Sequence, residues 1–244
     1  MLVNRFVFMA ITATIMIVLL VLNVQTVVAV AITMLIMMTG YVIISIIRSK
    51  KRLSLLEDEC DPEAFIESTE KQRAITGRDQ KFNAYFDIDR AAGLITLGRF
   101  EEAKDILISV DKSRLSRKND SLLVYTINMM TCLYEMGEIT KAEELFETQI
   151  PNLAPINKRI VLATDLIVAQ RFFYLKRYDE SRKQFDKLIN QKFSKRIRLE
   201  ILYCLAQMDE EEGNEEAAMA KYSQIASEGN KLWISQKARE KCGK

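Results

Sequence analysis

The sequence predicts an all-α protein, with an N-terminal two-helix transmembrane hairpin followed by an α-solenoid of helical hairpins. Three observations lead to this prediction. The 244 residues include only three prolines and eight glycines, and about half are apolar, a composition that favours helix. A long uncharged stretch lies near the start of the chain, and a pattern of small and large apolar residues recurs along the remainder.

The uncharged stretch runs from Phe6 to Ile47. As one helix it would be about twice as long as the roughly 30 Å hydrocarbon core of a bilayer, so we expect it to fold back on itself. A polar cluster around Asn23 divides it into two spans, residues 6–22 and 27–47, within a hairpin over residues 1–47. The small residues that could bring the two helices into contact are Ala10, Thr14, Ala29 and Thr33.

The charges around the hairpin predict its orientation. Four basic residues follow the second span and none lies in the polar turn, so both termini and the repeat domain are expected in the cytoplasm. This makes the chain a multi-pass protein of the cell membrane. The alternative is a signal peptide cleaved near Ala29 and Ala31, after which the second apolar run would remain as a span. The membrane-facing basic residues are Arg48, Lys50, Lys51 and Arg52.

Residues 48–60 are expected to form a juxtamembrane linker, basic and then acidic, ahead of a helical-repeat domain over residues 61–244. Of the 35 basic residues only Arg5 lies within residues 1–47, and none of the 33 acidic ones does, which leaves 34 basic against 33 acidic residues. Such a balance gives no electrostatic attraction for nucleic acid. We therefore expect no nucleic-acid partner.

A repeated pattern begins at "LGRFEEAKDIL", aligned on Gly98. Its further copies are "MGEITKAEELF" on Gly137, "LKRYDESRKQF" on Lys176 and "EGNEEAAMAKY" on Gly213, so these four anchors are 39, 39 and 37 residues apart. Glycine permits the left-handed backbone that ends a helix, and two closely packed helices need small side chains where their backbones approach. A small residue follows each anchor by five positions and a large one by nine: Ala103, Ala142, Ser181 and Ala218, then Leu107, Phe146, Phe185 and Tyr222.

These positions resemble those of the tetratricopeptide repeat (TPR), over roughly residues 81–228. The resemblance implies about four divergent repeats, each made of a helix A and a helix B. The copies depart from the family pattern, because Lys176 replaces an anchor glycine, Glu215 replaces a turn aromatic, no helix A carries the family's tryptophan, and the period exceeds 34 residues. We expect loops between the repeats that are longer than usual.

Capping helices are expected at both ends of the solenoid, over residues 61–76 and 231–242. Asp61 and Asn230 are the candidate N-caps, and Gly243 is the candidate stop. The run "DECDPE" at the first of these helix starts could instead be a metal or signalling site, but the chemistry of a helix start explains it.

The sequence lacks the motifs of several common catalytic sites. It has no histidine, which excludes Ser–His and Cys–His pairs and imidazole metal ligands, and it has no glycine-rich phosphate loop. We interpret the acidic run at residues 210–216 as a solvated face. The four cysteines are interpreted as core or surface thiols, with a reactive Cys60 as the alternative. We expect no enzymatic activity, no catalytic residue, no cofactor and no metal.

The expected function is that of a membrane-anchored cytoplasmic scaffold or adaptor, of bacterial origin, that binds other proteins in a TPR-like groove. The alternative is a regulatory or assembly subunit of a membrane transporter or envelope enzyme, which would act mainly through its transmembrane hairpin. A soluble repeat domain that still bound the partner would favour the first interpretation.

The TPR resemblance implies a groove lined by positions of helix A that do not pack against helix B. No residue of the family's clamp for a terminal carboxylate is present, so we expect an apolar or amphipathic peptide segment as the ligand. Replacing Tyr134 and Tyr174 together by alanine is expected to weaken binding and to leave stability nearly unchanged. The predicted groove residues are Tyr85, Ile88, Ile95, Val124, Ile127, Tyr134, Leu166, Gln170, Phe173, Tyr174, Tyr203 and Gln207.

The connections between repeats are basic, whereas the turns inside repeats are acidic, and in a stack of hairpins these two sets lie on opposite edges. Part of this pattern complements the helix macrodipoles. Four cations lie near starts of A helices, however, where the dipole disfavours them, and they favour a basic edge that faces anionic membrane lipid. These cations are Lys158, Arg159, Arg196 and Arg198.

Overall fold

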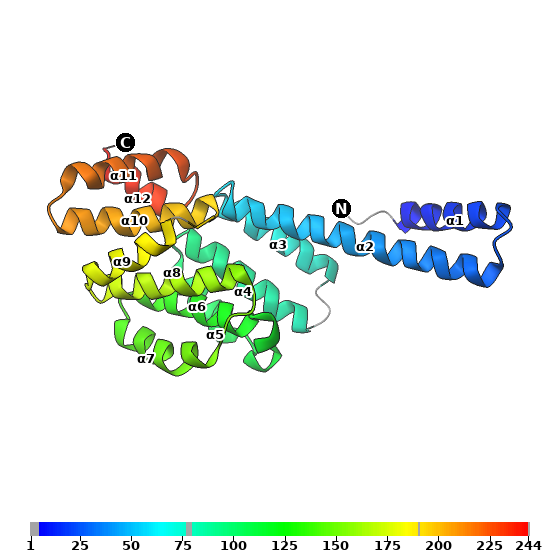
Figure 1. Ribbon diagram of the computed structural model, residues 1–244, viewed down its shortest axis with the longest axis horizontal. Helices are drawn as coiled ribbons and strands as arrows, with labels where there is room; N and C mark the ends of the chain where they lie inside the picture. Colours follow the sequence, from blue (N-terminus) through cyan, green and yellow to red (C-terminus); the bar gives the residue numbers. More distant parts are fainter. Residues whose placement is uncertain (1–4, 77–79, 190, 244) are drawn as a thin grey trace. The chain divides into compact units, whose positions relative to one another are not determined.

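The computed structural model describes residues 5–76, 80–189 and 191–243. Within these ranges the chain forms twelve α-helices and three short 3-10 turns and no strand, which confirms the all-α class (Figure 1). The chain divides into two compact units, Met1–Leu53 and Ser54–Lys244.

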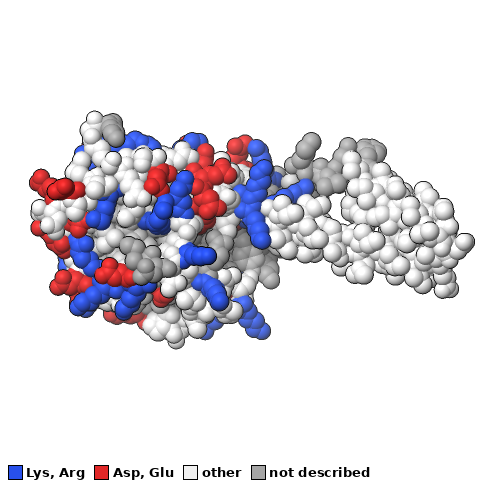
Figure 2. All heavy atoms as spheres, turned by 45° about the horizontal axis from the view of Figure 1, so that its top comes forward, with Lys and Arg blue, Asp and Glu red and all other residues white. Residues whose placement is uncertain are grey.

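The first unit consists of α1 (Arg5–Val21) and most of α2 (Thr26–Glu57), joined by a turn in which Asn23 has a φ of 58°. Its surface carries no charge over the apolar stretch (Figure 2). By length and composition α2 could cross a membrane, and α1 adds a shorter apolar helix over Val7–Val21. Of the four predicted small contact residues, Ala29 and Thr33 are buried, whereas Ala10 and Thr14 are exposed.

The predicted start of the linker lies within a helix. Residues 48–57 continue α2 without a break, because the segment "RSKKRLSLLE" contains neither glycine nor proline and is rich in residues that favour helix. Only residues 58–61 separate α2 from the next helix. The basic residues Arg48, Lys50, Lys51 and Arg52 therefore lie on a helix.

The second unit contains a first capping helix, four helical hairpins and a last capping helix. The capping helices are α3 (Pro62–Thr76) and α12 (Trp233–Lys241). The hairpins are α4 (Gln80–Thr96) with α5 (Phe100–Ser109), α6 (Ser121–Glu135) with α7 (Ile139–Gln149), α8 (Lys158–Tyr174) with α9 (Tyr178–Ile189), and α10 (Lys195–Glu211) with α11 (Glu215–Glu228). The 3-10 turns are η1 (Lys112–Arg114), η2 (Arg117–Asn119) and η3 (Ile150–Asn152).

All four anchors adopt the left-handed conformation that the sequence predicts. Their φ angles are 77° at Gly98, 75° at Gly137, 58° at Lys176 and 80° at Gly213. Each turn has the same two backbone hydrogen bonds. The anchor N–H donates to the carbonyl three residues earlier, and the N–H of the following residue donates to the carbonyl five residues before that residue. This Schellman pattern ends every helix A, at Lys176 as well, where the backbone adopts it without a glycine.

The small residues predicted to let the paired helices approach are all buried. Ala103, Ala142 and Ser181 have no exposed surface, and the Ser181 hydroxyl donates a 2.9 Å hydrogen bond to the Ala169 carbonyl, so its polar group is satisfied. The large residue nine positions after the anchor is buried in three repeats. In the second repeat Phe146 is half-buried instead, under the Arg171 guanidinium at 4.3 Å from its ring centre.

Because the paired helices are antiparallel, the solenoid has two distinct edges. We call the edge that contains the four anchor turns the anchor rim. The opposite edge, which contains the connections 110–120, 150–157 and 191–194, is the inter-repeat rim. Contacts between α3 and α4 extend this arrangement to the first capping helix, since Arg73 pairs with Asp87 while Ile66 lies against Gly93.

The start of α3 is as predicted, whereas the start of α12 is not. The Asp61 carboxylate accepts a 3.0 Å hydrogen bond from the Ala64 N–H, as an N-cap does. At α12 the N-cap is Leu232 rather than Asn230. Asn230 has a φ of 46°, and its amide donates a 2.9 Å hydrogen bond to the Glu59 carbonyl, so it connects the two ends of the unit instead of capping a helix.

Further contacts join the two ends of the second unit. The Lys231 N–H donates to the Cys60 carbonyl at 3.2 Å, and its ammonium group lies 2.9 Å from Asp61 and 3.0 Å from Glu63. Cys60 itself is fully buried, and this burial raises the pKa of its thiol. The alternative of a reactive Cys60 is therefore wrong, because a reactive thiol needs exposure and a lowered pKa.

Candidate protein-binding groove

The twelve predicted groove residues all lie on A helices, and the structure leaves none of them exposed. Ile88, Ile95, Tyr134 and Leu166 are buried, with between 2% and 9% of their surface accessible. The other eight are half-buried: Tyr85, Val124, Ile127, Gln170, Phe173, Tyr174, Tyr203 and Gln207. The surface that the sequence predicts as an open groove is therefore a covered one, which we call the covered groove.

The aromatic residues of the second and third repeats pack against each other. The rings of Tyr134 and Tyr174 stack with centroids 4.7 Å apart and planes 2° from parallel. The Tyr134 hydroxyl donates a 2.6 Å hydrogen bond to Glu143, which also accepts two hydrogen bonds of 2.9 Å and one of 2.6 Å from Arg171. This network connects α6, α7 and α8, so Tyr134 serves the packing of the repeats.

A buried carboxyl group lies beside the stacked rings. The Tyr174 hydroxyl donates a 2.5 Å hydrogen bond to Glu135, the last residue of α6. Burial raises the pKa of Glu135 to about 7, because the desolvation of its charged form outweighs the hydrogen bond that would stabilise the carboxylate. Glu135 is thus poised to change its charge near neutral pH.

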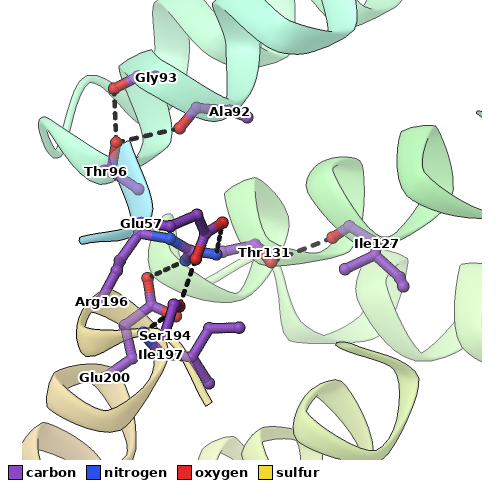
Figure 3. A network of polar contacts seen from close by, with 10 residues as sticks. All are labelled: Glu57, Ala92, Gly93, Thr96, Ile127, Thr131, Ser194, Arg196, Ile197 and Glu200. Carbon is purple, nitrogen blue, oxygen red and sulfur yellow. Dashed lines mark hydrogen bonds and ion pairs between the residues drawn. The ribbon is translucent and has the colours of Figure 1, made fainter. Parts of the chain in front are cut away.

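The last residue of α2 takes part in a second polar cluster (Figure 3). Arg196 donates hydrogen bonds of 2.9 Å to Glu57 and 2.6 Å to Glu200, and the Ser194 hydroxyl donates to the other oxygen of Glu57. Burial raises the pKa of Glu200, although Arg196 opposes this shift. The prediction that Arg196 faces lipid is therefore wrong, because its guanidinium neutralises two largely buried carboxyl groups. The side chain of Arg159 lies outside the described residues.

The single tryptophan of the chain lies between the first and the fourth repeats. Trp233, the first residue of α12, contacts Phe100 of the first repeat edge-on at 5.4 Å between ring centroids. It also contacts Tyr203 of the fourth repeat at 5.3 Å. The capping helix thus bridges the first and fourth repeats, and does not cover the end of the solenoid alone.

Sequence reasoning missed the long-range contacts that two residues make in this region, Glu57 and Trp233. Glu57 was assigned to a linker, and Trp233 to a helix that covers only the last repeat. Each meets partners that are more than one hundred positions away in the chain, Ser194 and Phe100, so no local pattern pairs them. The Trp233 ring does leave one local signal, since the neighbouring Gly98 has room for no side chain: a Cβ there would lie 2.9 Å from Cβ of Trp233.

Charged residues elsewhere in the second unit are mostly paired. Glu210, part of the acidic run, accepts a 2.8 Å hydrogen bond from the Tyr222 hydroxyl and pairs with Lys241, while Glu212 pairs with Arg182 at 2.7 Å. Within the described residues, no group of three or more cysteine or acidic side chains could hold a metal ion.

Comparison with known proteins identifies one family. The family model described as the SusR N-terminal TPR domain matches residues 65–228, about two thirds of the chain. The match begins within α3 and extends to the end of α11, so it includes all four hairpins. No curated protein and no solved structure matches the chain.

Proposed function

We propose that this chain, which belongs to the family of SusR N-terminal TPR domains, is a scaffold or adaptor anchored in the cell membrane that binds other proteins in the cytoplasm. TPR domains generally bind protein partners, and this membership is the observation that supports the proposal most directly. The apolar helix α2, with its exposed side chains, supports the membrane anchor.

In the proposed topology α1 and α2 both cross the membrane, and both termini are cytoplasmic. Cysteine labelling in intact cells tests this. With Cys242 replaced by serine, the remaining cysteines are buried, so an introduced cysteine dominates the labelling. A membrane-impermeant maleimide should label Asn23→Cys in intact cells and Lys50→Cys only after permeabilisation. Labelling of Lys50→Cys in intact cells, or of Asn23→Cys only after permeabilisation, would contradict the topology.

The proposed binding site is the covered groove, which a partner can enter only by displacing the chain's own residues. The helix α12, whose Trp233 contacts the groove residue Tyr203, suggests what kind of segment fits. In α12 Ile234 and Ala238 are buried, whereas Lys237 and Glu240 are exposed, so the covering segment is amphipathic and carries one aromatic anchor, Trp233. We therefore propose an amphipathic helical segment as the partner, which replaces Trp233 between Phe100 and Tyr203.

Photocrosslinking with the full-length chain in cells tests groove binding. A photoreactive phenylalanine at Gln207 in the groove should crosslink to a partner protein, and the Trp233→Ala variant should increase the yield by vacating the site. The control position is Lys183, an exposed residue of α9, a B helix. Crosslinks from Lys183 alone, or an unchanged yield in the Trp233→Ala variant, would exclude the covered groove as the site.

A second candidate function follows from the first unit. Many exposed large apolar side chains lie on α1 and α2. A regulatory or assembly subunit of a transporter or envelope enzyme would need such a surface if it acted through its hairpin. Replacing residues 1–47 by an unrelated transmembrane hairpin separates the two functions. A scaffold keeps its crosslinks from Gln207, whereas a hairpin-dependent subunit loses its partner.

A further inference from the structure

The exposed apolar residues of the second unit are unevenly distributed. Among its described residues, six large apolar side chains are exposed, and five of them lie at the inter-repeat rim. Ile75 is next to the end of α3, Phe82 is in the first turn of α4, and Ile108 is next to the end of α5. The remaining two rim residues are Ile156 and Val161, and the sixth exposed side chain is Met219 of α11.

Basic residues accompany these apolar side chains. The connection 110–120 contains Lys112, Arg114, Arg117 and Lys118 against two acids, Asp111 and Asp120, and Lys158 begins α8. Asp111 pairs with Arg114 at 3.0 Å, and Asp120 is buried. The exposed charge of this part of the rim is therefore positive.

The loop that carries Ile156 is held rigidly. The buried Asp120 carboxylate accepts hydrogen bonds from the backbone N–H groups of Ile156 at 3.0 Å and Asn157 at 2.8 Å. The Ile156 side chain is nevertheless 66% exposed. An ordered backbone thus presents an apolar side chain to solvent two residues before Lys158, and its burial against an apolar surface would be favourable.

A hollow of about 660 Å³ lies in the basic connection 110–120. It is lined by two serines and three cations, Ser113, Ser116, Arg114, Arg117 and Lys118, together with Leu115. Ser113 and Arg114 both bond to Asp111, whereas cations such as Arg117 and Lys118 suit the phosphate of an anionic lipid headgroup. Basic side chains beside exposed aliphatic and aromatic ones are typical of surfaces that rest at the boundary between headgroups and acyl chains.

We propose that the inter-repeat rim is a membrane-binding surface that rests on anionic lipid, with Ile108, Ile156 and Val161 at acyl-chain level and the cations of residues 112–118 among the headgroups. This inference rests on the proposed membrane anchor. Glu57, which bonds to Ser194 at this rim, follows Ile47 by ten residues (57 − 47), and ten residues reach at most about 35 Å even when fully extended. The segment that joins the proposed anchor to Glu57 is therefore short.

Lipid quenching of a fluorescent probe tests the proposal on the full-length chain in vesicles. The probe is an environment-sensitive fluorophore on Ile156→Cys in the Cys242→Ser background. In vesicles with about one third phosphatidylglycerol, spin-labelled lipid should quench this probe at least twofold more than in phosphatidylcholine vesicles, and high salt should reduce the difference. A probe on Met219→Cys is the matched control and should show no such difference.

The double variant Arg117→Gln, Lys118→Gln should lower the quenching of the Ile156 probe in anionic vesicles while the chain still floats with the vesicles. Equal quenching of the Ile156 and Met219 probes in a chain that floats would overturn the membrane-binding rim and leave the anchor intact. A chain that an alkaline wash removes from the vesicles would overturn the anchor, and the rim proposal with it.

Discussion

The covered groove and the anchor rim are built from the same four A helices, yet they differ in what stabilises them. At the anchor rim each turn is local, with the same two backbone hydrogen bonds in every repeat. In the covered groove the contacts join different repeats, such as Tyr134 of the second repeat stacked on Tyr174 of the third. The anchor rim therefore follows from short sequence motifs, whereas the groove depends on how neighbouring repeats pack on each other.

Two glutamates of the second repeat show the difference most directly. Glu135 and Glu138 are three residues apart, but burial raises the pKa of Glu135 to about 7, whereas hydrogen bonds from Lys104 and Lys141 lower the pKa of Glu138 to about 2. At pH 7 Glu135 is thus about half protonated, whereas Glu138 on the other side of the turn is ionised. Substitutions in the covered groove should consequently cause large losses of stability that spread through the unit. Substitutions at the anchor rim should cause small, local losses.

The largest expected effect comes from replacing Tyr134 and Tyr174 together by alanine. Since the two rings stack on each other inside the covered groove, we expect the variant to lose at least about 4 kcal/mol of unfolding free energy. Urea unfolding of the full chain in mild detergent, followed by the fluorescence of Trp233, measures this loss.

From the sequence alone, the double variant was expected to keep its stability, because both rings were expected to be exposed. The structure buries Tyr134 and half-buries Tyr174, so a loss is now expected. Met219→Ala, the truncation of an exposed side chain, is the control and should change the midpoint little. A double variant with the midpoint of the unchanged protein would show that the groove is open in solution.

Next in size is the pH dependence that Glu135 contributes. Folding raises the pKa of Glu135 from 4.5 to about 7, so the unfolded chain releases this proton at lower pH than the folded protein does. The contribution to stability is therefore fully present below pH 4.5 and is lost as the pH rises through 7. The loss approaches about 3 kcal/mol above pH 8, by the usual 1.36 kcal/mol per pKa unit. Glu135→Gln keeps an acceptor for the Tyr174 hydroxyl and should remove this loss, which unfolding midpoints at pH 5 and pH 8.5 would reveal.

Glu138→Gln is the matched control at the anchor rim, and its effect on the pH dependence of stability should have the opposite sign. A lowered pKa contributes stability above pH 4.5 that is lost as the pH falls towards 2, so this variant should be less stable than the unchanged protein at neutral pH. Equal pH profiles for the two variants would contradict the difference in burial between groove and rim.

The sequence predicted the anchor rim well because the residues that form each anchor turn lie within a few positions of one another. The alignment identified Lys176 as an anchor although it is not glycine, and it identified the small residues at the helix contacts, such as Ser181. The groove residues were assigned to the correct helices, but their burial was missed. Exposure depends on what packs against a surface, and here Tyr134 packs on Tyr174 of the next repeat and Tyr203 packs on Trp233 of the last capping helix.

Substitutions of two anchor glycines compare an anchor turn that contacts Trp233 with one that does not. Gly98 and Gly137 have nearly equal φ angles, but only Gly98 contacts Trp233, and the space around Gly137 is open. Gly137→Ala should cost about 1 kcal/mol for the left-handed backbone alone. Gly98→Ala should cost about 2–3 kcal/mol, because the new methyl group also pushes against the tryptophan that closes the groove. Urea unfolding quantifies both costs, and Trp233 emission should shift only in the Gly98 variant; equal costs would mean that Trp233 does not close the groove in solution.

The smallest expected effect is a gain in stability, at Lys176. This exposed lysine holds a φ of 58°, a conformation that disfavours every residue with a Cβ, and the pair of hydrogen bonds at its turn matches the glycine turns. Lys176→Gly removes that strain but adds freedom to the unfolded chain, so the net gain should be about 0.5–1 kcal/mol. The inverse substitution, Gly213→Lys, places a lysine in an equally open turn and should lose a similar amount. Thermal unfolding of both variants measures the pair, and a loss of stability in Lys176→Gly would mean that the lysine side chain contributes to the turn beyond its backbone.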